Sequence, residues 1–390
     1  MGEEQSCDGI VKLPHQQEPR KGRKGEKQMA NNGLKKAIAA AGVVGAVMSP
    51  MVVMAAPSPD SAETVTDLEE SGAISDVQKD ADGKVTSFKV EEGIKDGFQY
   101  FDLNGDPELV YIKDGAYSKE VSDSANDTAA FVNNVFKETL DREVDNGGRD
   151  YWVGEMMKDT APVTGADLIA SIVYAPEYVE KQKTNEQIVA DMYASMLGRA
   201  DAAENDKEGF DYWVGCLNNG MTVQWIVSGF CGSDEFKGIC EDLGVEAGTY
   251  QSQSILDYNV TRTAFVAGLY QDVLGRAGSE AELTYWVDAL TAEENQQTAA
   301  QAIGGFVFSE EATATPVDDD AFVNMLYKAF MGREADPEGL AYWKGQLADG
   351  AAREAVFNGF LGSEEFQKVC ADSFIAVGDP IPVPTDSVEE

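Results

Sequence analysis

Four arginines each precede a Tyr-Trp pair in the chain, and this combination of side chains could bind a sugar. An aromatic face and a guanidinium that donates hydrogen bonds to hydroxyl groups together suit such a ligand. The structural alternative is that each arginine caps helix carbonyls, pairs with acidic residues of the next helix cap, or lies over the indole ring. The candidate ligand-binding residues are Arg142, Arg199, Arg276, Arg333, Tyr151, Tyr212, Tyr285 and Tyr342.

We favour the structural alternative for the arginines, because the Trp of each pair lies in phase with neighbouring apolar residues that form a core. Successive residues on a helix point about 100° apart. The Tyr of each pair is therefore the better candidate for an exposed contact.

Composition limits the classes of function. The 390 residues carry a net charge of -39, which argues against binding to nucleic acid or to anionic lipid. The single histidine, His15, lies in the segment that we expect export to remove. Without it the chain has no Ser-His or Cys-His nucleophile and no His-ligated zinc, so we expect a protein that is not an enzyme. A glycoside hydrolase that uses paired carboxylates stays an alternative.

The basic Lys35-Lys36 pair, the apolar run over residues 37–48 and the small residues up to Ala55 are typical of a secretory signal peptide. We expect residues 1–55 to form this signal region, with cleavage after Ala55 and translation starting at Met29. The sequence thus predicts a secreted or cell-surface protein. It contains no second apolar run long enough to anchor the exported chain in a membrane.

Acidic residues in the loops raise the alternative of a calcium-dependent adhesin. Asp102, Asn104 and Asp106 have the spacing of the first calcium ligands in an EF-hand loop, but Pro107 and Lys113 stand where that loop needs Gly and Glu. The acidic loops between the helices have unequal lengths and no ligand register. We therefore expect hairpin turns, helix caps and a solvated surface rather than a metal site, and no cofactor.

Four cysteines remain after the signal region, and none belongs to a Cys-x-x-Cys motif. An even number in an exported chain permits disulfides, in three connectivities. We expect one or two bridges, with buried free thiols as the alternative. The candidates are Cys216, Cys231, Cys240 and Cys370.

The chain divides into a linker, a β segment and four helical units. Residues 56–75 are small and polar and predict a linker. Alternating residues and Asp-Gly or Asn-Gly turns over 76–118 predict a small β-meander. The repeated Tyr-Trp pairs define helical units over 129–184, 185–250, 260–315 and 318–376, each of three to four helices, followed by a flexible tail over 377–390.

The last helical unit shows the expected plan most clearly. Its first helix, "AFVNMLYKAFMGR", ends at Gly332, and its second begins with Asp336 as N-cap and Pro337 in the first turn. The third helix contains "VFNGFLG", and Ser363 begins a short fourth helix at "SEEF". Trp343 fills the small core between these helices.

These motifs resemble the bacterial family catalogued as domain of unknown function 4214. The resemblance lies in Phe-Val-x-x-Leu-Tyr-x-x-x-Leu-Gly-Arg, then Tyr-Trp, Gly-Phe and Ser-x-Glu-Phe, and it covers roughly residues 129–375. Units 1 and 3 depart from it, since unit 1 has Asp141 for the usual Gly and no clear Ser-x-Glu-Phe, and unit 3 lacks the final Phe. Such domains occur in tandem in exported proteins of Clostridia type and look distantly like the phycobilisome linker domain. The resemblance implies a helical fold, export and a binding or linking role, and it supplies no catalytic residue.

We therefore expect an exported bacterial protein that acts as a non-catalytic surface binding or scaffold module. Its expected partner is the cell wall, or another extracellular glycan or protein.

Overall fold

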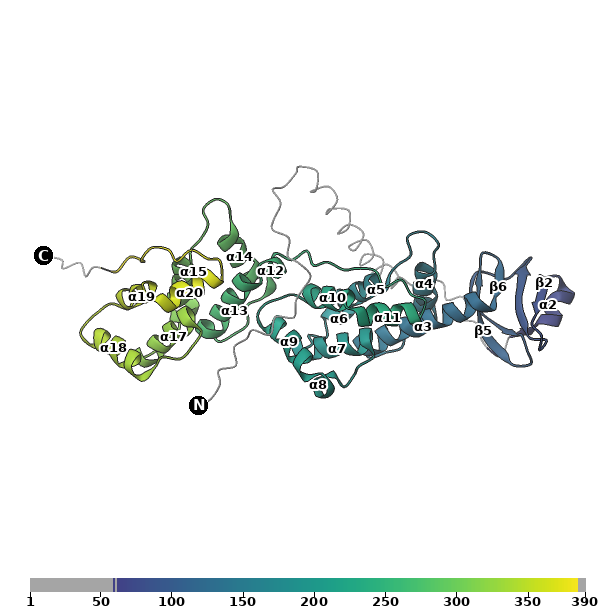
Figure 1. Ribbon diagram of the computed structural model, residues 1–390, viewed down its shortest axis with the longest axis horizontal. Helices are drawn as coiled ribbons and strands as arrows, with labels where there is room; N and C mark the ends of the chain where they lie inside the picture. The colour runs from purple at the N-terminus through teal and green to yellow at the C-terminus, as the bar shows by residue number, and fades with distance from the viewer. Residues whose placement is uncertain (1–58, 60–61, 385–390) are drawn as a thin grey trace. The chain divides into compact units, whose positions relative to one another are not determined.

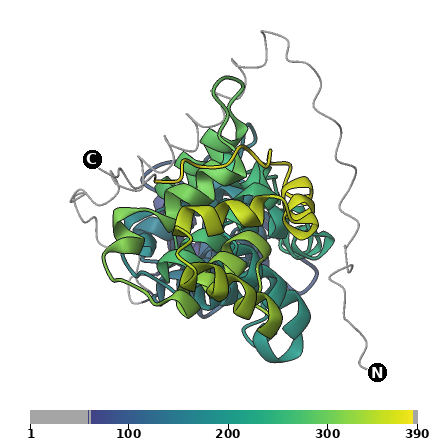
Figure 2. The same cartoon turned by 90° about the vertical axis from the view of Figure 1, so that its left-hand side faces the viewer.

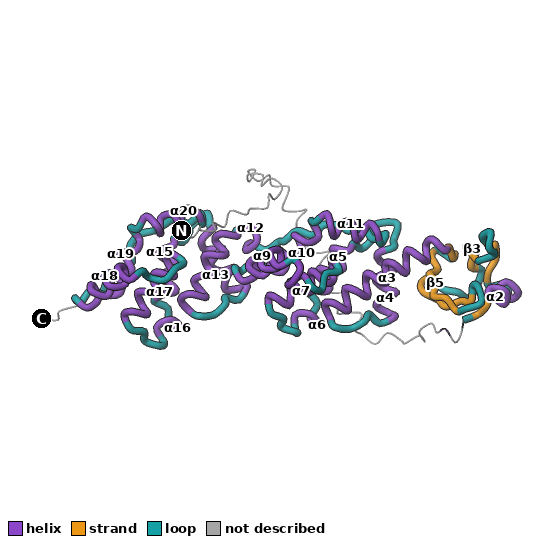
Figure 3. Tube along the Cα trace, turned by 60° about the horizontal axis from the view of Figure 1, so that its bottom comes forward, coloured by secondary structure: helices purple, strands orange, loops and turns teal. Residues whose placement is uncertain are grey.

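The computed structural model describes residue 59 and residues 62–384. The expected signal region, with its start at Met29 and cleavage after Ala55, lies outside these described residues. Within them, a small sheet comes first and helices follow, as the colours of Figure 3 show. The expected mainly helical fold with a preceding β segment is confirmed. None of the helices described is long and apolar enough to cross a membrane.

The β segment is a six-stranded sheet with the spatial order β1-β4-β5-β6-β3-β2. It is the purple to blue part of Figure 1, where β2, β5 and β6 are labelled. Only the pairing of β1 with β4 is parallel. The other four pairings are antiparallel. The strands are β1 (Glu63–Thr64), β2 (Ile74–Lys79), β3 (Val85–Val90), β4 (Gly97–Asp102), β5 (Pro107–Lys113) and β6 (Ala116–Ser118).

The sheet begins earlier in the chain than the sequence indicated. Helix α2 (Val65–Ser71) follows β1 directly, and its Val65 and Leu68 are buried. The polar composition of residues 56–75 predicted a linker with little to pack, and this prediction is wrong from Glu63 onward. Two apolar residues three positions apart are enough to hold one short helix on the sheet.

Both faces of the sheet are covered, because its strands bury side chains that point to one face and side chains that point to the other. Phe101 and Ile112 pack with Leu68 of α2. On the opposite face, Phe98 and Tyr111 are register partners whose rings lie edge to face at 5.0 Å. They pack against the helices that follow the sheet. The sheet is therefore attached to the first helical unit through an apolar contact.

The first helix of unit 1, α3 (Lys119–Leu140), begins ten residues before the predicted unit boundary at 129. Its first turns are polar and small, which concealed the helix in the sequence. Ser122 and Ala125 are buried three residues apart and face the sheet. The backbone N–H of Tyr111 donates to the Ser122 hydroxyl at 3.1 Å. The second half of α3 packs inside unit 1.

Each helical unit has a first, second, third and fourth helix in the same order. Unit 2 has an extra short helix, α8, and α12 precedes unit 3. The helices are α3, α4 (Asn146–Met156), α5 (Gly165–Val173), α6 (Pro176–Val179); α7 (Asn185–Leu197), α8 (Ala202–Asn205), α9 (Lys207–Asn218), α10 (Val223–Gly232), α11 (Asp234–Asp242); α12 (Ile255–Tyr258), α13 (Val260–Leu274), α14 (Glu280–Thr291), α15 (Ala299–Val307), α16 (Glu310–Thr313); α17 (Asp319–Met331), α18 (Pro337–Ala348), α19 (Arg353–Leu361) and α20 (Glu364–Asp372).

The caps predicted for unit 4 are confirmed. Gly332 ends α17 in the left-handed conformation with φ of 64°. The Asp336 side chain accepts from the Gly339 N–H at the start of α18, with Pro337 in the first turn. Ser363 accepts from the Phe366 N–H at the start of α20.

The units share their cores in pairs. One continuous cluster of buried apolar residues extends from Leu256 to Ile375 and contains residues of both unit 3 and unit 4. The ribbons of these two units are the green to yellow ones in Figure 2. In the first pair, Phe131 of unit 1 lies 6.5 Å from Phe236 of unit 2, ring centroid to ring centroid. The repeating structural element is therefore a pair of units.

A segment after the last helix of each pair returns to the first unit of that pair. The N–H groups of Gly165 and Ala166 donate to the carbonyls of Glu246 and Ala247 at 2.8 and 2.9 Å. These bonds attach the end of unit 2 to the start of α5. Their equivalents in the second pair run from Ala299 to Ala376 and from Ala300 to Val377, at 2.8 and 2.9 Å.

The second return segment corrects the flexible tail predicted over residues 377–390. Asn358 and Ile381 exchange two hydrogen bonds, at 2.8 and 2.9 Å, so the chain is held on α19 at least as far as Ile381. The isolated prolines around Ile381 made this stretch look unstructured, because it has no periodicity of its own.

Each Trp of the last three Tyr-Trp pairs lies against a glycine of the third helix. In unit 4, a Cβ placed on Gly359 would lie 2.3 Å from the Trp343 ring. Trp343 also stacks on Phe360, with ring centroids 5.0 Å apart. The Gly-Phe motif thus provides both the space and the contact surface for the indole.

We expect Gly359→Ala to lower the free energy of unfolding by about 1–3 kcal/mol, because the new methyl group must displace a packed ring. Gly345→Ala in α18 is the matched control, since a Cβ there meets no atom within 4 Å. Its expected effect is a gain of about 0.5–1 kcal/mol from helix propensity. Urea denaturation followed by circular dichroism measures both, and equal effects would contradict this packing argument.

Candidate binding surface

The arginine of each unit forms a bidentate ion pair with a glutamate of the fourth helix. In unit 4, Nε and Nη2 of Arg333 both donate to the Glu365 carboxylate at 2.7 Å. The equivalent pairs are Arg142 with Glu177, Arg199 with Glu235, and Arg276 with Glu311.

The same guanidinium lies over an aromatic ring of the first helix. Arg333 is 5.1 Å from the ring centroid of Tyr327, and Arg276 is 5.0 Å from that of Tyr270. Arg276 also pairs with Glu282 in the first turn of α14, at 2.9 Å. The arginine therefore joins the first, second and fourth helices of its unit. Among the structural roles considered above, the ion pair is present, and the ring beneath the arginine belongs to the first helix instead of being the Trp.

The tyrosines of the Tyr-Trp pairs are placed differently from the arginines. Tyr212, Tyr285 and Tyr342 are 53%, 63% and 59% exposed, whereas Tyr151 is half-buried. Each packs edge to face on its own Trp, with ring centroids 4.9–5.6 Å apart. A packed tryptophan thus orients each exposed tyrosine, which lowers the entropy that the ring would lose on contact with a ligand.

Tyr285 lines a shallow depression of about 550 Å³ on the surface of α14. The other residues that line it are Glu280, Ala281, Thr284 and Asp288. The depression combines one aromatic ring with two carboxylates and a hydroxyl, a set of groups that can accept hydrogen bonds from a polar ligand.

The acidic loops act as helix caps. Asp145 accepts from the Gly148 N–H at 2.8 Å, and Asp206 accepts from the Gly209 N–H at 3.3 Å. In the β segment, Asp102 accepts from the Gly105 N–H at 2.6 Å within a turn. The part of the chain that the structure describes contains no group of three or more Asp, Glu, Cys or His residues arranged to hold a metal ion.

The predicted disulfides are not formed, because the four candidate cysteines are free thiols. Cys240 and Cys370 occupy equivalent places in different pairs, and each is buried as a small apolar residue within its own pair. Burial raises the pKa of the thiols of Cys240 and Cys370 to about 11. Cys231 is likewise buried, whereas Cys216 is half-exposed.

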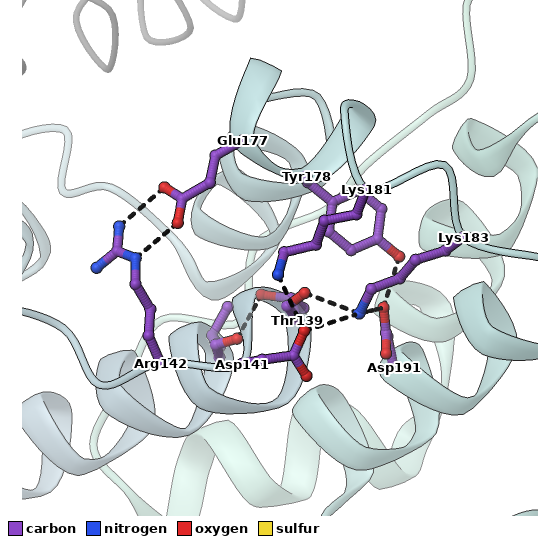
Figure 4. Close-up of polar contacts among 9 residues, drawn as sticks. Thr139, Asp141, Arg142, Glu177, Tyr178, Lys181, Lys183 and Asp191 are labelled. Carbon is purple, nitrogen blue, oxygen red and sulfur yellow. Dashed lines mark hydrogen bonds and ion pairs between the residues drawn. The ribbon is translucent and has the colours of Figure 1, made fainter.

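A buried polar cluster between units 1 and 2 was not foreseen from the sequence (Figure 4). The Asp191 carboxylate accepts from Lys183 Nζ at 2.7 Å and from the Tyr178 hydroxyl at 2.8 Å. Lys183 also donates to the Thr139 carbonyl at 2.9 Å. Burial raises the pKa of Asp191, while the bonds from Lys183 and Tyr178 oppose that rise. The available signal was a charged residue beside Met192 on the inner face of α7.

The second pair replaces this cluster with apolar residues, since Met325 stands at the position of Asp191 and Val317 at that of Lys183. In the first pair, the side chains of Asp191 and Lys183 are nearly buried, at 11% and 12% exposure. The cluster therefore contributes little net stability compared with an apolar core of the same volume, although breaking it leaves a buried charge unpaired.

We expect Asp191→Met alone to lower the free energy of unfolding by about 3–5 kcal/mol, because the buried Lys183 ammonium loses its near carboxylate and keeps only Asp141 at 4.0 Å and the Thr139 carbonyl. The triple variant Tyr178→Phe, Lys183→Val, Asp191→Met removes the three polar side chains that bond to one another, so that neither the ammonium nor the carboxylate of the cluster is left buried. We expect it to remain within about 2 kcal/mol of the parent chain. Denaturant unfolding distinguishes the two, and a triple variant less stable than the single one would contradict the expectation.

Acid should weaken the arginine pairs. The hydrogen bond from Arg276, with those from Ser279, lowers the pKa of Glu282 to about 2 from its usual 4.5. A lowered pKa stabilises the fold fully above pH 4.5, and that stabilisation is lost as the pH falls toward 2. We expect Glu282→Gln to be less stable than the parent at pH 7, with the difference shrinking toward pH 2. Glu280→Gln, in the same helical turn, is the control, and a difference that does not depend on pH would contradict the assignment.

Comparison with known proteins identifies the repeated unit. A family model described as a domain of unknown function (DUF4214) matches residues 116–164, 166–240, 250–315 and 303–370. No curated protein matches the chain. The four matches follow the four units that share the arginine pair, and the first begins near the start of α3. The chain therefore belongs to the family of domain of unknown function 4214, in four tandem copies.

Proposed function

We propose that this chain is an exported, non-catalytic binding and scaffold protein whose contacts are made by the exposed tyrosines of its tandem units. The observation that carries the proposal is that the arginine and the tyrosine of each unit have different surroundings. The arginine forms an ion pair with a glutamate of its own unit. The tyrosine of the Tyr-Trp dipeptide packs on its Trp and is exposed to solvent in three units.

Tyrosine suits this role because it offers a large, rigid contact surface with a polar end. It is also among the residues that carry most of the binding energy in protein interfaces. Several such contacts on one chain would act together, so that weak single contacts give a strong overall attachment.

The proposed location is outside the cell, either released or at the cell surface. It rests on the signal-like residues that precede Ala56. The net charge of -39 keeps such a chain soluble in an extracellular medium. The proposed partner is the cell wall or another extracellular glycan or protein.

The test is sedimentation of the exported chain, residues 56–390, with insoluble bacterial cell-wall material. We expect saturable pelleting, weakened at least about tenfold when Tyr212, Tyr285 and Tyr342 are all replaced by alanine, because each replacement removes a contact of about 1–2 kcal/mol.

The matched control is Tyr258→Ala, which removes a tyrosine of similar exposure, 67%, that lies outside the Tyr-Trp pairs. Circular dichroism confirms that each variant is folded. Pelleting that the triple variant leaves unchanged would contradict the role of the tyrosines.

A further inference from the structure

Units 2 and 3 meet at a close contact that fixes the join between the two pairs. Gly220 has φ of +86°, and a Cβ there would lie 2.9 Å from the side chain of Leu283 and 3.0 Å from that of Thr263. The backbone N–H and the hydroxyl of Thr222 both donate to the Asp257 carboxylate, at 2.8 and 2.6 Å. Asp257 is only 4% exposed. The start of unit 3 thus covers one end of unit 2.

Among residues 62–384, none covers the corresponding end of unit 4. Its residues Leu347, Gly350, Ala351 and Ala352 occupy the positions of Leu217, Gly220, Met221 and Thr222, and we call these four the open end face. A Cβ on Gly350 would meet no atom within 4 Å.

The second helices of units 2 and 4 also differ in burial. Helix α9 of unit 2 buries Phe210 and Leu217, whereas the equivalent helix α18 buries no residue. Leu340 and Leu347 stand at the same positions of α18 and are left partly exposed. The open end face therefore adjoins a helix whose apolar residues are less buried than those of α9.

The structure of unit 1 explains why a second copy of this chain does not bind the open end face. In unit 1, Ala129 and Arg149 correspond to Thr263 and Leu283, the residues with which unit 3 covers Gly220. The sheet already lies on them, because the Arg149 guanidinium is 4.4 Å from the ring centroid of Phe98 and Ala129 packs with the same cluster. A second copy therefore offers its equivalents of Thr263 and Leu283 in unit 1 already covered by the sheet.

We propose that the open end face binds a further pair of helical units of this family, whose first unit is not covered by a sheet. The chemistry of that partner follows from the internal contact. It presents small and branched apolar side chains to Gly350, as Leu283 and Thr263 do to Gly220. It also brings a carboxylate to the start of α19, where Ala352 supplies no side-chain cap of its own.

The proposal adds a protein partner to the proposed scaffold role and does not involve the exposed tyrosines. Its test uses residues 250–384 of this chain as the probe. The second pair has a continuous core of its own, from Leu256 to Ile375. Separated from unit 2, it exposes the face that contains Asp257 and Leu283.

We expect the probe to bind the immobilised full chain saturably, and Ala351→Arg in the full chain to weaken this binding at least tenfold. Ala341→Arg, on the preceding helix α18, is the control, because its equivalent in unit 2, Asp211, is 58% exposed and lies outside the contact. Asp257→Ala in the probe should also weaken binding. Circular dichroism of the probe and of each variant establishes that they are folded.

Absence of binding by the folded probe would overturn the proposal, as would equal binding by the Ala351→Arg and Ala341→Arg chains. Dimerisation of the full chain that Ala351→Arg abolishes would also overturn it, since it would make a second copy the occupant. The triple tyrosine variant should bind the probe normally, and Ala351→Arg should not change pelleting with cell-wall material. Failure of this proposal is thereby distinguishable from failure of the proposed function.

Discussion

The size of one helical unit limits the apolar surface that it can bury, and the rest of the structure follows from this limit. A unit of about 60 residues buries so little surface that its free energy of unfolding would be small if it stood alone. The cores are accordingly built from two units, as the continuous cluster from Leu256 to Ile375 shows. Within a unit, one tryptophan inserted against a glycine and one arginine held by a glutamate replace the larger number of apolar contacts that a bigger domain would have.

The pairing also explains why the chain repeats itself on two scales. Every unit has its own Arg–Glu ion pair and its own Tyr-Trp dipeptide. By contrast, the segment that returns to an earlier unit follows only units 2 and 4. Equivalent residues near the ends of units 2 and 4 are 130 positions apart, as Cys240 is from Cys370. The charged cluster around Asp191 shows that the two pairs use different chemistry at one equivalent position, since the fold needs that volume filled and accepts either a satisfied polar cluster or an apolar one.

Much of the helical architecture could be predicted from the sequence, because it depends on local signals. The caps at Gly332, Asp336 and Ser363 and the placing of Trp343 are determined by residues only a few positions apart. The features that could not be predicted depend on distant partners. The first turns of α3 become a buried helix only because Tyr111 lies against them. Ile381 is held only because Asn358 is nearby.

The residues of the candidate site divide in the same way into those that local sequence could predict and those that depend on distant partners. Exposure of the tyrosines follows from helix periodicity, whereas the glutamate partner of each arginine lies more than 30 residues away in the chain and could be named only as a class. The expected disulfides are absent for a related reason, since the number of cysteines does not determine which sulfur atoms lie within bonding distance in the folded chain. The return segments have a consequence for how the protein acquires its structure. The N–H groups of Gly165 and Ala166 at the start of α5 find their acceptors at Glu246 and Ala247, about 80 residues later in the chain, which raises the contact order of the first pair of units and slows its folding. A chain that ends within unit 2 would leave these two groups without their acceptors, so the smallest piece of the protein that keeps these bonds is a pair of units.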